Sequence, residues 1–399
     1  MQQLFKNIKG DKAIWAVVAI LALFSFLPVY SASTNLVYVV GNGTTFGHLF
    51  KHAFLLLMGI GVIYAVHKIP YRYFKALSLL FMPLVLVLLL FTLAQGTTIG
   101  GANASRWIQI PYVGITFQPS TLAAIVLLVF VAKYLAKIKD QKVTFKETIW
   151  PLWAPVFAVL ALILPANFST TAIIFFMVLV LCFIGGYPWK YLLGIVGTGA
   201  VCLLLFVLMA KAFPGLFPNR VDTWISRIES FAGEGDSEAD YQIEKAKIAI
   251  ATGGVVGVGA GKSVMKNFLP QSSSDFIYAI IVEEYGLVGG LIMVFIYLLL
   301  LFRIVIVAHK ADSVFGKLLV LAAGLPIIFQ AFINMAVAVE LFPVTGQTLP
   351  LISSGGTSIW MTCLALGIIL SVSAKRQEEL ETEEEIDTQN PLDILSEQL

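Results

Sequence analysis

The chain contains ten long apolar runs, most of them close to the 20 or so residues with which a helix crosses a ~30 Å hydrocarbon layer. Inside a bilayer, a spanning segment has to satisfy its own backbone hydrogen bonds, which favours helices over open sheets. We therefore expect an all-α polytopic membrane protein with about ten transmembrane helices. The runs cover approximately 13–30, 47–66, 74–94, 118–136, 149–164, 171–187, 191–212, 276–302, 315–339 and 358–374.

The composition agrees with this expectation. Hydrophobic residues make up 58% of the 399 residues and charged residues 13%, whereas soluble proteins have roughly 45–50% and about 25%. This difference argues against a cytosolic enzyme and against a nucleic-acid-binding protein, so we expect no nucleic-acid partner. The stretch 149–187 is too long for one crossing, and we interpret 165–170 as the turn of a helical hairpin.

The positive charges predict the orientation in the membrane, because Lys and Arg of short loops gather on the cytoplasmic side. With the N-terminus inside, only Lys51 and Arg106 fall in short loops on the outer side. Both termini are therefore expected in the cytoplasm. The predicted parts are a cytoplasmic N-terminus (1–12), a membrane domain (13–374) with one large extracytoplasmic loop (213–275) between helices 7 and 8, and an acidic, disordered cytoplasmic tail (375–399).

The large loop is the main polar segment outside the tail. Its residues 221–231 place apolar side chains at helical spacing and predict a helix lying in the membrane interface. A second helix is predicted over 241–251, followed by a run of glycines between Gly253 and Gly261. A nucleotide-binding loop is disfavoured, because Val256 occupies the position of its first glycine. Two interpretations stay open: the glycines let the backbone approach a phosphate with Lys262 and Lys266, or they only permit a tight return to the membrane.

Asp275 opens the apolar run that follows this loop. Such a residue can serve as a helix N-cap. At the outer surface, beside Lys262 and Lys266, its carboxylate could instead accept a proton from a hydroxyl group. Glu283 and Glu284 lie deeper in the same run, where acidic residues are costly and have a functional or helix-pairing role by default.

Metal-binding motifs are weak. His48 and His52 have the spacing of two ligands on one helix face, but no third ligand lies nearby in the sequence. A structural or interfacial role is favoured for both, and we predict no metal site formed by the protein alone.

Several motifs together resemble the SEDS family (shape, elongation, division and sporulation), the group that contains FtsW and RodA. The matching blocks are Ala251–Gly254, Gly257–Ser263 with Lys266, Asp275–Ile277, Glu283–Gly286, Arg106–Ile108, Phe117–Ser120, Asn334–Met335, Pro343–Gly346 and Leu349–Ser353 with Gly355–Gly356. Details around Asn334 and Thr348–Pro350 favour the division-type, FtsW-like branch.

The resemblance implies a peptidoglycan glycosyltransferase that polymerises lipid II into β-1,4 glycan strands for the septal wall and releases undecaprenyl diphosphate. Asp275 falls at the family's essential aspartate and would deprotonate the acceptor hydroxyl. The candidates for substrate binding are Lys266 at a family position, Lys262, Arg106 and Arg220 by charge, and Gln118, Ser263 and Ser353 within the matching motifs. A divalent cation, Mg²⁺ or Mn²⁺, would assist as a cofactor.

The resemblance also implies partners and a location. The partners would be a class B penicillin-binding protein and other membrane proteins of the division apparatus. The location would be the bacterial cytoplasmic (inner) membrane at the division septum.

The sequence departs from the family pattern at three places. The usual Glu and Lys after Gln-Pro-Ser are Thr121 and Ala124, so an ion pair of the family cannot form. Ser273-Ser274 replaces the His-Thr that commonly precedes the aspartate, and Asn167 and Ser169 alter an acidic segment. These changes affect regulation and substrate positioning more than the type of reaction.

Two alternatives to the enzyme remain. A lipid II flippase would use intramembrane charges such as Glu283 and Glu284 to move lipid without joining sugars. A division scaffold would act only by docking partner helices, and Asp275→Asn would then be silent in cells.

Overall fold

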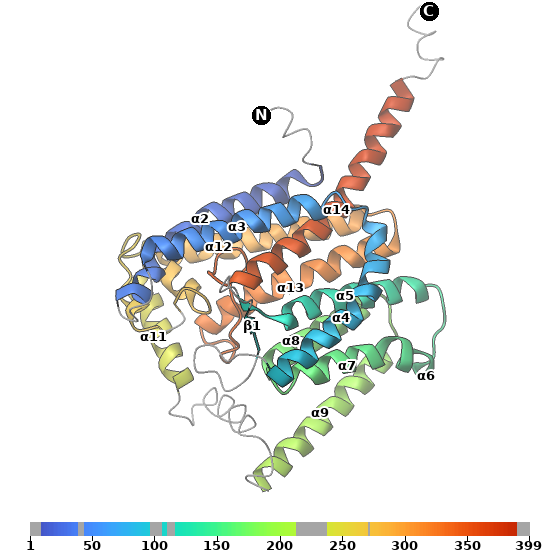
Figure 1. Ribbon diagram of the computed structural model, residues 1–399, viewed down its shortest axis with the longest axis horizontal. Coiled ribbons are helices and arrows are strands. Elements are labelled where there is room, and N and C mark those ends of the chain that lie inside the picture. Colours follow the sequence, from blue (N-terminus) through green and yellow to red (C-terminus); the bar gives the residue numbers. More distant parts are fainter. Residues whose placement is uncertain are drawn as a thin grey trace, which may run out of the picture.

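The computed structural model describes residues 9–38, 44–95, 106–109, 116–212, 238–269 and 272–388. Within these residues, eight helices are long and apolar enough to cross a membrane, judged by length and composition, and Phe168–Ile184 and Trp189–Leu205 are two shorter apolar helices. These helices fall in the ten predicted runs, and the predicted all-α class is confirmed (Figure 1). The exact number of crossings stays a prediction.

The elements follow one another with short connections over most of the chain. They are α2 (Lys12–Tyr38), α3 (Thr45–Val66), η1 (Tyr71–Tyr73), α4 (Phe74–Gln95), β1 (Ile108–Gln109), β2 (Thr116–Phe117), α5 (Pro119–Ile138), α6 (Phe145–Thr148), η2 (Ile149–Trp153), α7 (Ala154–Ile163), α8 (Phe168–Ile184), α9 (Trp189–Ala212), α11 (Glu238–Gly253), η3 (Met265–Asn267), α12 (Ile277–Lys310), α13 (Val314–Ala338) and α14 (Gly356–Thr388). The two short strands pair antiparallel, with Ile108 opposite Phe117.

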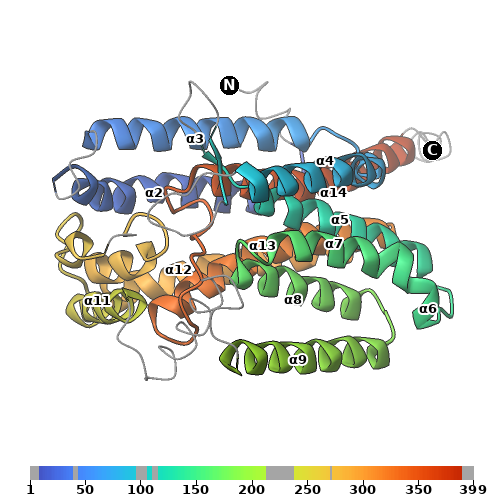
Figure 2. The same cartoon turned by 60° about the horizontal axis from the view of Figure 1, so that its bottom comes forward.

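Two hydrophobic clusters organise the helices. The first cluster joins α2, α3, α11, α12, α13 and α14, and we call these helices the α12 bundle. The second joins α4, α5, α7, α8 and part of α9, which we call the α5 bundle. Helix α13 packs against both α12 and α5 and links the two bundles. Helix α9 lies at the margin beside α8 (Figures 1 and 2).

Contacts near both ends of the described chain fix the ends of the bundle. The Gly10 amide donates to Oε1 of Gln377 at 3.1 Å, which ties the start of α2 to α14. Arg303, late in α12, forms an ion pair with Asp11. The start of α2 and the late part of α14 therefore lie at one end of the molecule (Figure 1). Asp275 precedes α12 and lies at the opposite end.

Helix α12 is interrupted at Gly286, which has φ 68° and ψ −171°. At the break, backbone amides and carbonyls of α12 lose their partners within the helix. The segment 253–259 forms hydrogen bonds with them. The amides of Leu287 and Val288 donate to the carbonyls of Gly254 and Val255 at 2.9 and 3.3 Å. Irregular backbone inside a membrane domain is tolerated where protein buries it, and this pairing does so.

Other local predictions have clear outcomes. The predicted hairpin is present, because α7 ends at Ile163 and α8 begins at Phe168, with the Asn167 side chain accepting a hydrogen bond from the Thr170 amide at 3.2 Å. The predicted helix 241–251 is part of α11. The predicted interfacial helix 221–231 lies outside the described residues.

The acidic tail was expected to be disordered from residue 375. Helix α14 instead continues to Thr388, because its glutamates are good helix formers.

Candidate active site

Asp275 is half-buried at the entrance to α12, held through its backbone. The Asn334 amide nitrogen, near the end of α13, donates to the carbonyl oxygens of both Asp275 and Gln347 at 2.7 Å. Asn334 itself is buried. One buried amide therefore fixes the backbone of Asp275 against the segment that leads from α13 to α14.

That segment encloses the aspartate from a second side. The Ser353 hydroxyl donates to the carbonyl of Ser274 at 2.6 Å, and the Ser354 amide donates to the carbonyl of Ser273 at 3.0 Å. A methyl group added at Gly346, which has φ 69°, would lie 3.4 Å from Oδ2 of Asp275. The carboxylate thus lies beside the turn at Gly346.

Glu283 and Glu284 form the centre of a buried polar cluster, with 0% and 1% of their surface exposed. The Ser263 hydroxyl donates to Oε2 of Glu283, and the Val264 and Met265 amides donate to Oε1 at 2.9 and 3.2 Å. Adjacent residues on a regular helix point in different directions. Ser263 nevertheless contacts both carboxyl groups, because its amide also lies 3.4 Å from Oε1 of Glu284. The cluster therefore anchors the loop that precedes Asp275.

Lys266 is part of the same cluster and is only 8% exposed. Its ammonium group donates to the Ser31 hydroxyl at 3.1 Å and to the Gly261 carbonyl at 2.8 Å. Ser31 in turn donates to Glu284. Sequence reasoning missed Ser31, because one serine in the apolar first helix carries no signal of a partner far along the chain.

The glycine segment packs directly against α12. The Val258 and Gly259 amides donate to the carbonyls of Glu283 and Glu284 at 3.0 Å. A Cβ atom at Gly257 would lie 2.2 Å from the Glu284 carbonyl oxygen, so only glycine fits. Of the two interpretations of the glycines, the geometry favours close packing, because these two amides are engaged by the protein. Lys262 is exposed on this segment.

A small cavity of about 60 Å³ lies between the two bundles, lined from α5, α8, α13 and α14. Thr121 and Ala124, where the resemblance predicts an ion pair, line it. Gln347 joins the cavity to the Asp275 region, since its side chain donates to the Thr170 hydroxyl at 3.4 Å and its backbone accepts from Asn334. The lining side chains are uncharged.

The remaining predicted substrate contacts lie apart from the buried cluster. The Nε atom of Arg106 donates to the Ala166 carbonyl at 2.8 Å, in the turn between α7 and α8. Gln118 is the N-cap residue of α5, and its carbonyl accepts from the Thr121 hydroxyl at 2.7 Å. Arg220 lies outside the described residues.

The structure offers little support for a metal held by the protein alone. Among the described residues there is no group of three His, Cys, Asp or Glu side chains placed to hold a metal ion.

The chain is similar to known proteins over most of its length. Residues 11–378 match the FtsW/RodA/SpoVE family, described as cell cycle proteins. The probable peptidoglycan glycosyltransferase FtsW of Nitrosomonas europaea is 32% identical over 91% of this chain and 92% of its own length. The corresponding protein of Nitrosococcus halophilus is 31% identical over 82% of each chain.

Solved structures show the same fold. A chain of a peptidoglycan synthase complex that coordinates polymerization and crosslinking aligns with a TM-score of 0.70 and 25% identity, over 92% of this chain and 98% of that one. The rod shape determining protein RodA of Thermus thermophilus aligns with a TM-score of 0.63 and 24% identity, over 91% and 96%. With a family match over most of its length, this chain belongs to the FtsW/RodA/SpoVE family.

Proposed function

We propose that the protein is a peptidoglycan glycosyltransferase that polymerises lipid II into β-1,4 glycan strands. The observation that carries the proposal is the half-buried position of Asp275 at the end of the bundle away from both ends of the described chain. Asn334 fixes the backbone carbonyl of Asp275, and Ser353 fixes that of the preceding Ser274. The names of the relatives support the same activity. A septal role in division follows from their designation as FtsW.

In this proposal Asp275 acts as the general base. Asp275 accepts the proton of the acceptor GlcNAc 4-hydroxyl, whose oxygen attacks the anomeric carbon of the donor MurNAc. The bond from that carbon to the diphosphate oxygen breaks, and undecaprenyl diphosphate leaves with the electron pair. Attack from the opposite face turns the α-linked donor into a β-1,4 linkage.

Positive side chains would stabilise the charge that grows on the diphosphate. Exposed Lys262 is suited to direct contact, and Arg106 and Arg220 are proposed on the basis of charge and place. Lys266 already donates to Ser31 and Gly261, which supports a role in holding the loop beside the substrate. Ser263 and Ser353 act in this proposal by fixing the backbone around the site, and Gln118 at the start of α5 is proposed as a substrate contact.

A divalent cation would supply further stabilisation of charge on the diphosphate. No step above depends on it.

Partners and location complete the proposal. The similar chain of a peptidoglycan synthase complex supports a class B penicillin-binding protein as partner, with other membrane proteins of the division apparatus. We place the protein in the inner membrane at the septum as a multi-pass protein with both termini in the cytoplasm. The charge distribution of the short loops supports this orientation.

The decisive test compares Asp275→Asn with wild type. Each is purified with its cognate class B penicillin-binding protein, reconstituted with lipid II, and assayed for glycan strands. Removing a general base costs about 10² to 10⁴ in rate, so we expect polymer to fall at least about 100-fold. Asp240→Asn, in α11 of the same loop, is the matched control and should keep wild-type activity.

Two results would contradict the proposal. Wild-type amounts of polymer from Asp275→Asn would remove the assigned base. Translocated lipid II without any polymer from the wild-type protein would replace the enzyme with a flippase.

A further inference from the structure

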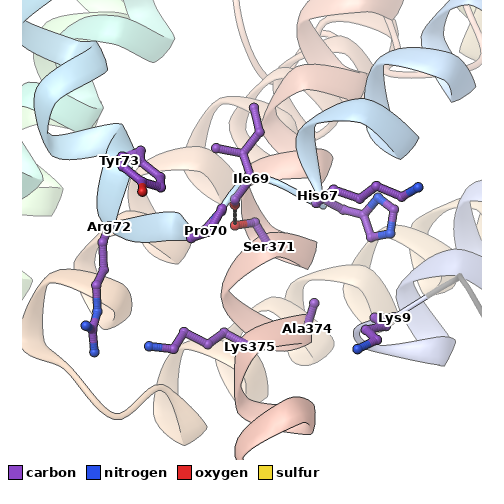
Figure 3. Close-up of a pocket in the computed structure, with 10 residues that line it drawn as sticks. Lys9, His67, Ile69, Pro70, Arg72, Tyr73, Ser371, Ala374 and Lys375 are labelled. Atoms are coloured by element: carbon purple, nitrogen blue, oxygen red, sulfur yellow. Dashed lines mark hydrogen bonds between the residues drawn. The ribbon is translucent and has the colours of Figure 1, made fainter.

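A second pocket lies at the opposite end of the molecule from Asp275. It has a volume of about 610 Å³ and is formed by the turn between α3 and α4, the late part of α14 and the residue before Gly10 (Figure 3). Its lining residues are Lys9, His67, Lys68, Ile69, Pro70, Arg72, Tyr73, Ser371, Ala374 and Lys375. The volume is in the range of ligand pockets, about 300–1,000 Å³. The proposed function does not use this pocket.

The lining carries several cations and no acid. Arg72 and Lys68 are exposed, and the Lys375 side chain extends toward the side of the pocket where Arg72 lies (Figure 3). The Lys375 ammonium also lies 5.8 Å from the centre of the Tyr71 ring, a contact that leaves its charge intact. An Arg guanidinium and Lys ammonium groups are the donors that bind phosphate in proteins.

Two acids near this end form ion pairs with arginines outside the pocket. Asp11 pairs with Arg303, and Asp312 pairs with Arg376. The wall of the pocket is held rigidly, because the Ser371 hydroxyl donates to the Ile69 carbonyl and joins α14 to the turn (Figure 3). The pocket is therefore a preformed cationic hollow.

The pocket also lies where a bilayer surface is expected. It sits between the end of α3 and the start of α4, two of the candidate membrane spans. Tyr73 is 62% exposed beside the cations, and Leu79 and Leu80, one to two turns along α4, are exposed apolar residues. A tyrosine at the level of the headgroups with apolar residues below it is typical of a membrane–water interface.

From these observations we infer that the pocket binds the phosphate headgroup of an anionic phospholipid from the adjacent leaflet. Basic pockets between transmembrane helices recognise such headgroups. The other conceivable occupant is the acidic tail of the chain itself. Helix α14, however, continues beyond Lys375 to Thr388 as a single helix that projects away from the bundle (Figure 1). The lipid is thus the occupant that the geometry favours.

Binding is tested with the full chain in a neutral detergent, titrated with short-chain phosphatidylglycerol and followed by native mass spectrometry. The pocket variant combines Arg72→Gln with Lys375→Gln. The matched control combines Lys139→Gln with Lys142→Gln, exposed residues between α5 and α6 at the same end of the bundle. Each surface cation contributes about fivefold to binding an anionic lipid, so the pocket variant should bind about 25-fold more weakly. The control should stay within about twofold, because its charges lie outside the pocket.

Further arms identify the source of the phosphate and test the role of the charge in the pocket. Phosphatidylcholine and inorganic phosphate should each bind at least about tenfold more weakly than phosphatidylglycerol, since one lacks net charge and the other lacks acyl chains. A variant with the tail glutamates Glu381, Glu383, Glu384 and Glu385 changed to Gln should bind phosphatidylglycerol like wild type. The variant Lys375→Arg keeps the positive charge at this position and should retain binding. Retained binding would show that the weaker binding of the pocket variant comes from the lost charge and not from a folding defect.

The inference is overturned by any of three results. Equal affinities of the pocket variant and the control would mean that the pocket is not the site. Inorganic phosphate binding as tightly as the lipid would point to a free anion. A marked gain in lipid affinity when the tail loses its charge would identify the tail as the natural occupant.

Discussion

The two bundles bury their polar groups in different ways. The α12 bundle encloses Glu283, Glu284 and Lys266 in a cluster of hydrogen bonds. The α5 bundle buries neutral groups, with the Tyr187 hydroxyl 2.7 Å from the Thr148 hydroxyl and accepting from the Trp153 indole at 3.1 Å. A charged group that is buried away from water is costly unless partners compensate its charge and form hydrogen bonds with it. A buried neutral group that loses a partner loses the free energy of about one hydrogen bond, which is a smaller cost. The α12 bundle is therefore the part of the molecule in which single changes should do most harm.

The largest effect is expected at Lys266. Replacing it with Met removes the buried ammonium group that donates to Ser31 and to the Gly261 carbonyl, and Ser31 is the group that donates to Glu284. A buried polar group left without its partner costs about 1–3 kcal/mol, and more where the group is charged, so we expect a loss of about 3 kcal/mol or more. The matched control is Lys262→Met, four residues away on the surface, which should change stability by less than about 0.5 kcal/mol. Thermal unfolding in detergent measures both variants. Similar melting temperatures for the two would show that the cluster does not depend on its lysine.

The next effect compares one substitution in the two bundles. A Cβ atom at Gly253 would lie 2.1 Å from the Val282 carbonyl oxygen, whereas one at Gly197 in α9 meets nothing within 4 Å. Gly253→Ala should cost up to about 3 kcal/mol through overpacking. Gly197→Ala should be neutral or stabilise by up to about 1 kcal/mol, because alanine favours helix. Melting temperatures that move together would contradict the close packing of α11 on α12.

The smallest effect is expected within the α5 bundle. Tyr187→Phe removes the hydroxyl shared by Thr148 and Trp153 and should cost about 1 kcal/mol for a neutral hydrogen bond. Thermal unfolding again provides the measurement, with Tyr73→Phe at an exposed position as control. A loss as large as that of Lys266→Met would erase the distinction between the bundles.

Much of the fold follows from the sequence, because membrane spans depend on long apolar runs that are visible without tertiary contacts. The hairpin at Asn167 and the helix after residue 238 were predictable for the same reason: a turn and a helical pattern are local. Asp275 stood out because it lies where a polar loop meets an apolar run. Its partners Asn334 and Ser353 lie 59 and 79 residues from their contacts at Asp275 and Ser274, and only the packing of α13 and α14 brings them close.

The joint anchoring of Glu283 and Glu284 could not be read from spacing. It depends on Ser263 reaching both carboxyl groups and on Ser31 arriving from the first helix. A span of more than 200 residues separates Ser31 from Lys266, so the contact is entirely tertiary. The same is true of the cationic pocket, which joins residues from the beginning, the first third and the end of the chain.

The break at Gly286 has a consequence for motion at the Asp275 end. Because the segment 253–259 completes the backbone pairing of α12 on both sides of the break, pulling it away would strand amides and carbonyls in the interior. This segment and the adjoining turns of α12 therefore shift as a rigid unit. If the Asp275 end opens to admit a long glycan, we expect the segment 346–348 on the other side of Asp275 to move, because its hydrogen bonds to the helices are made by the side chains of Gln330, Asn334 and Gln347.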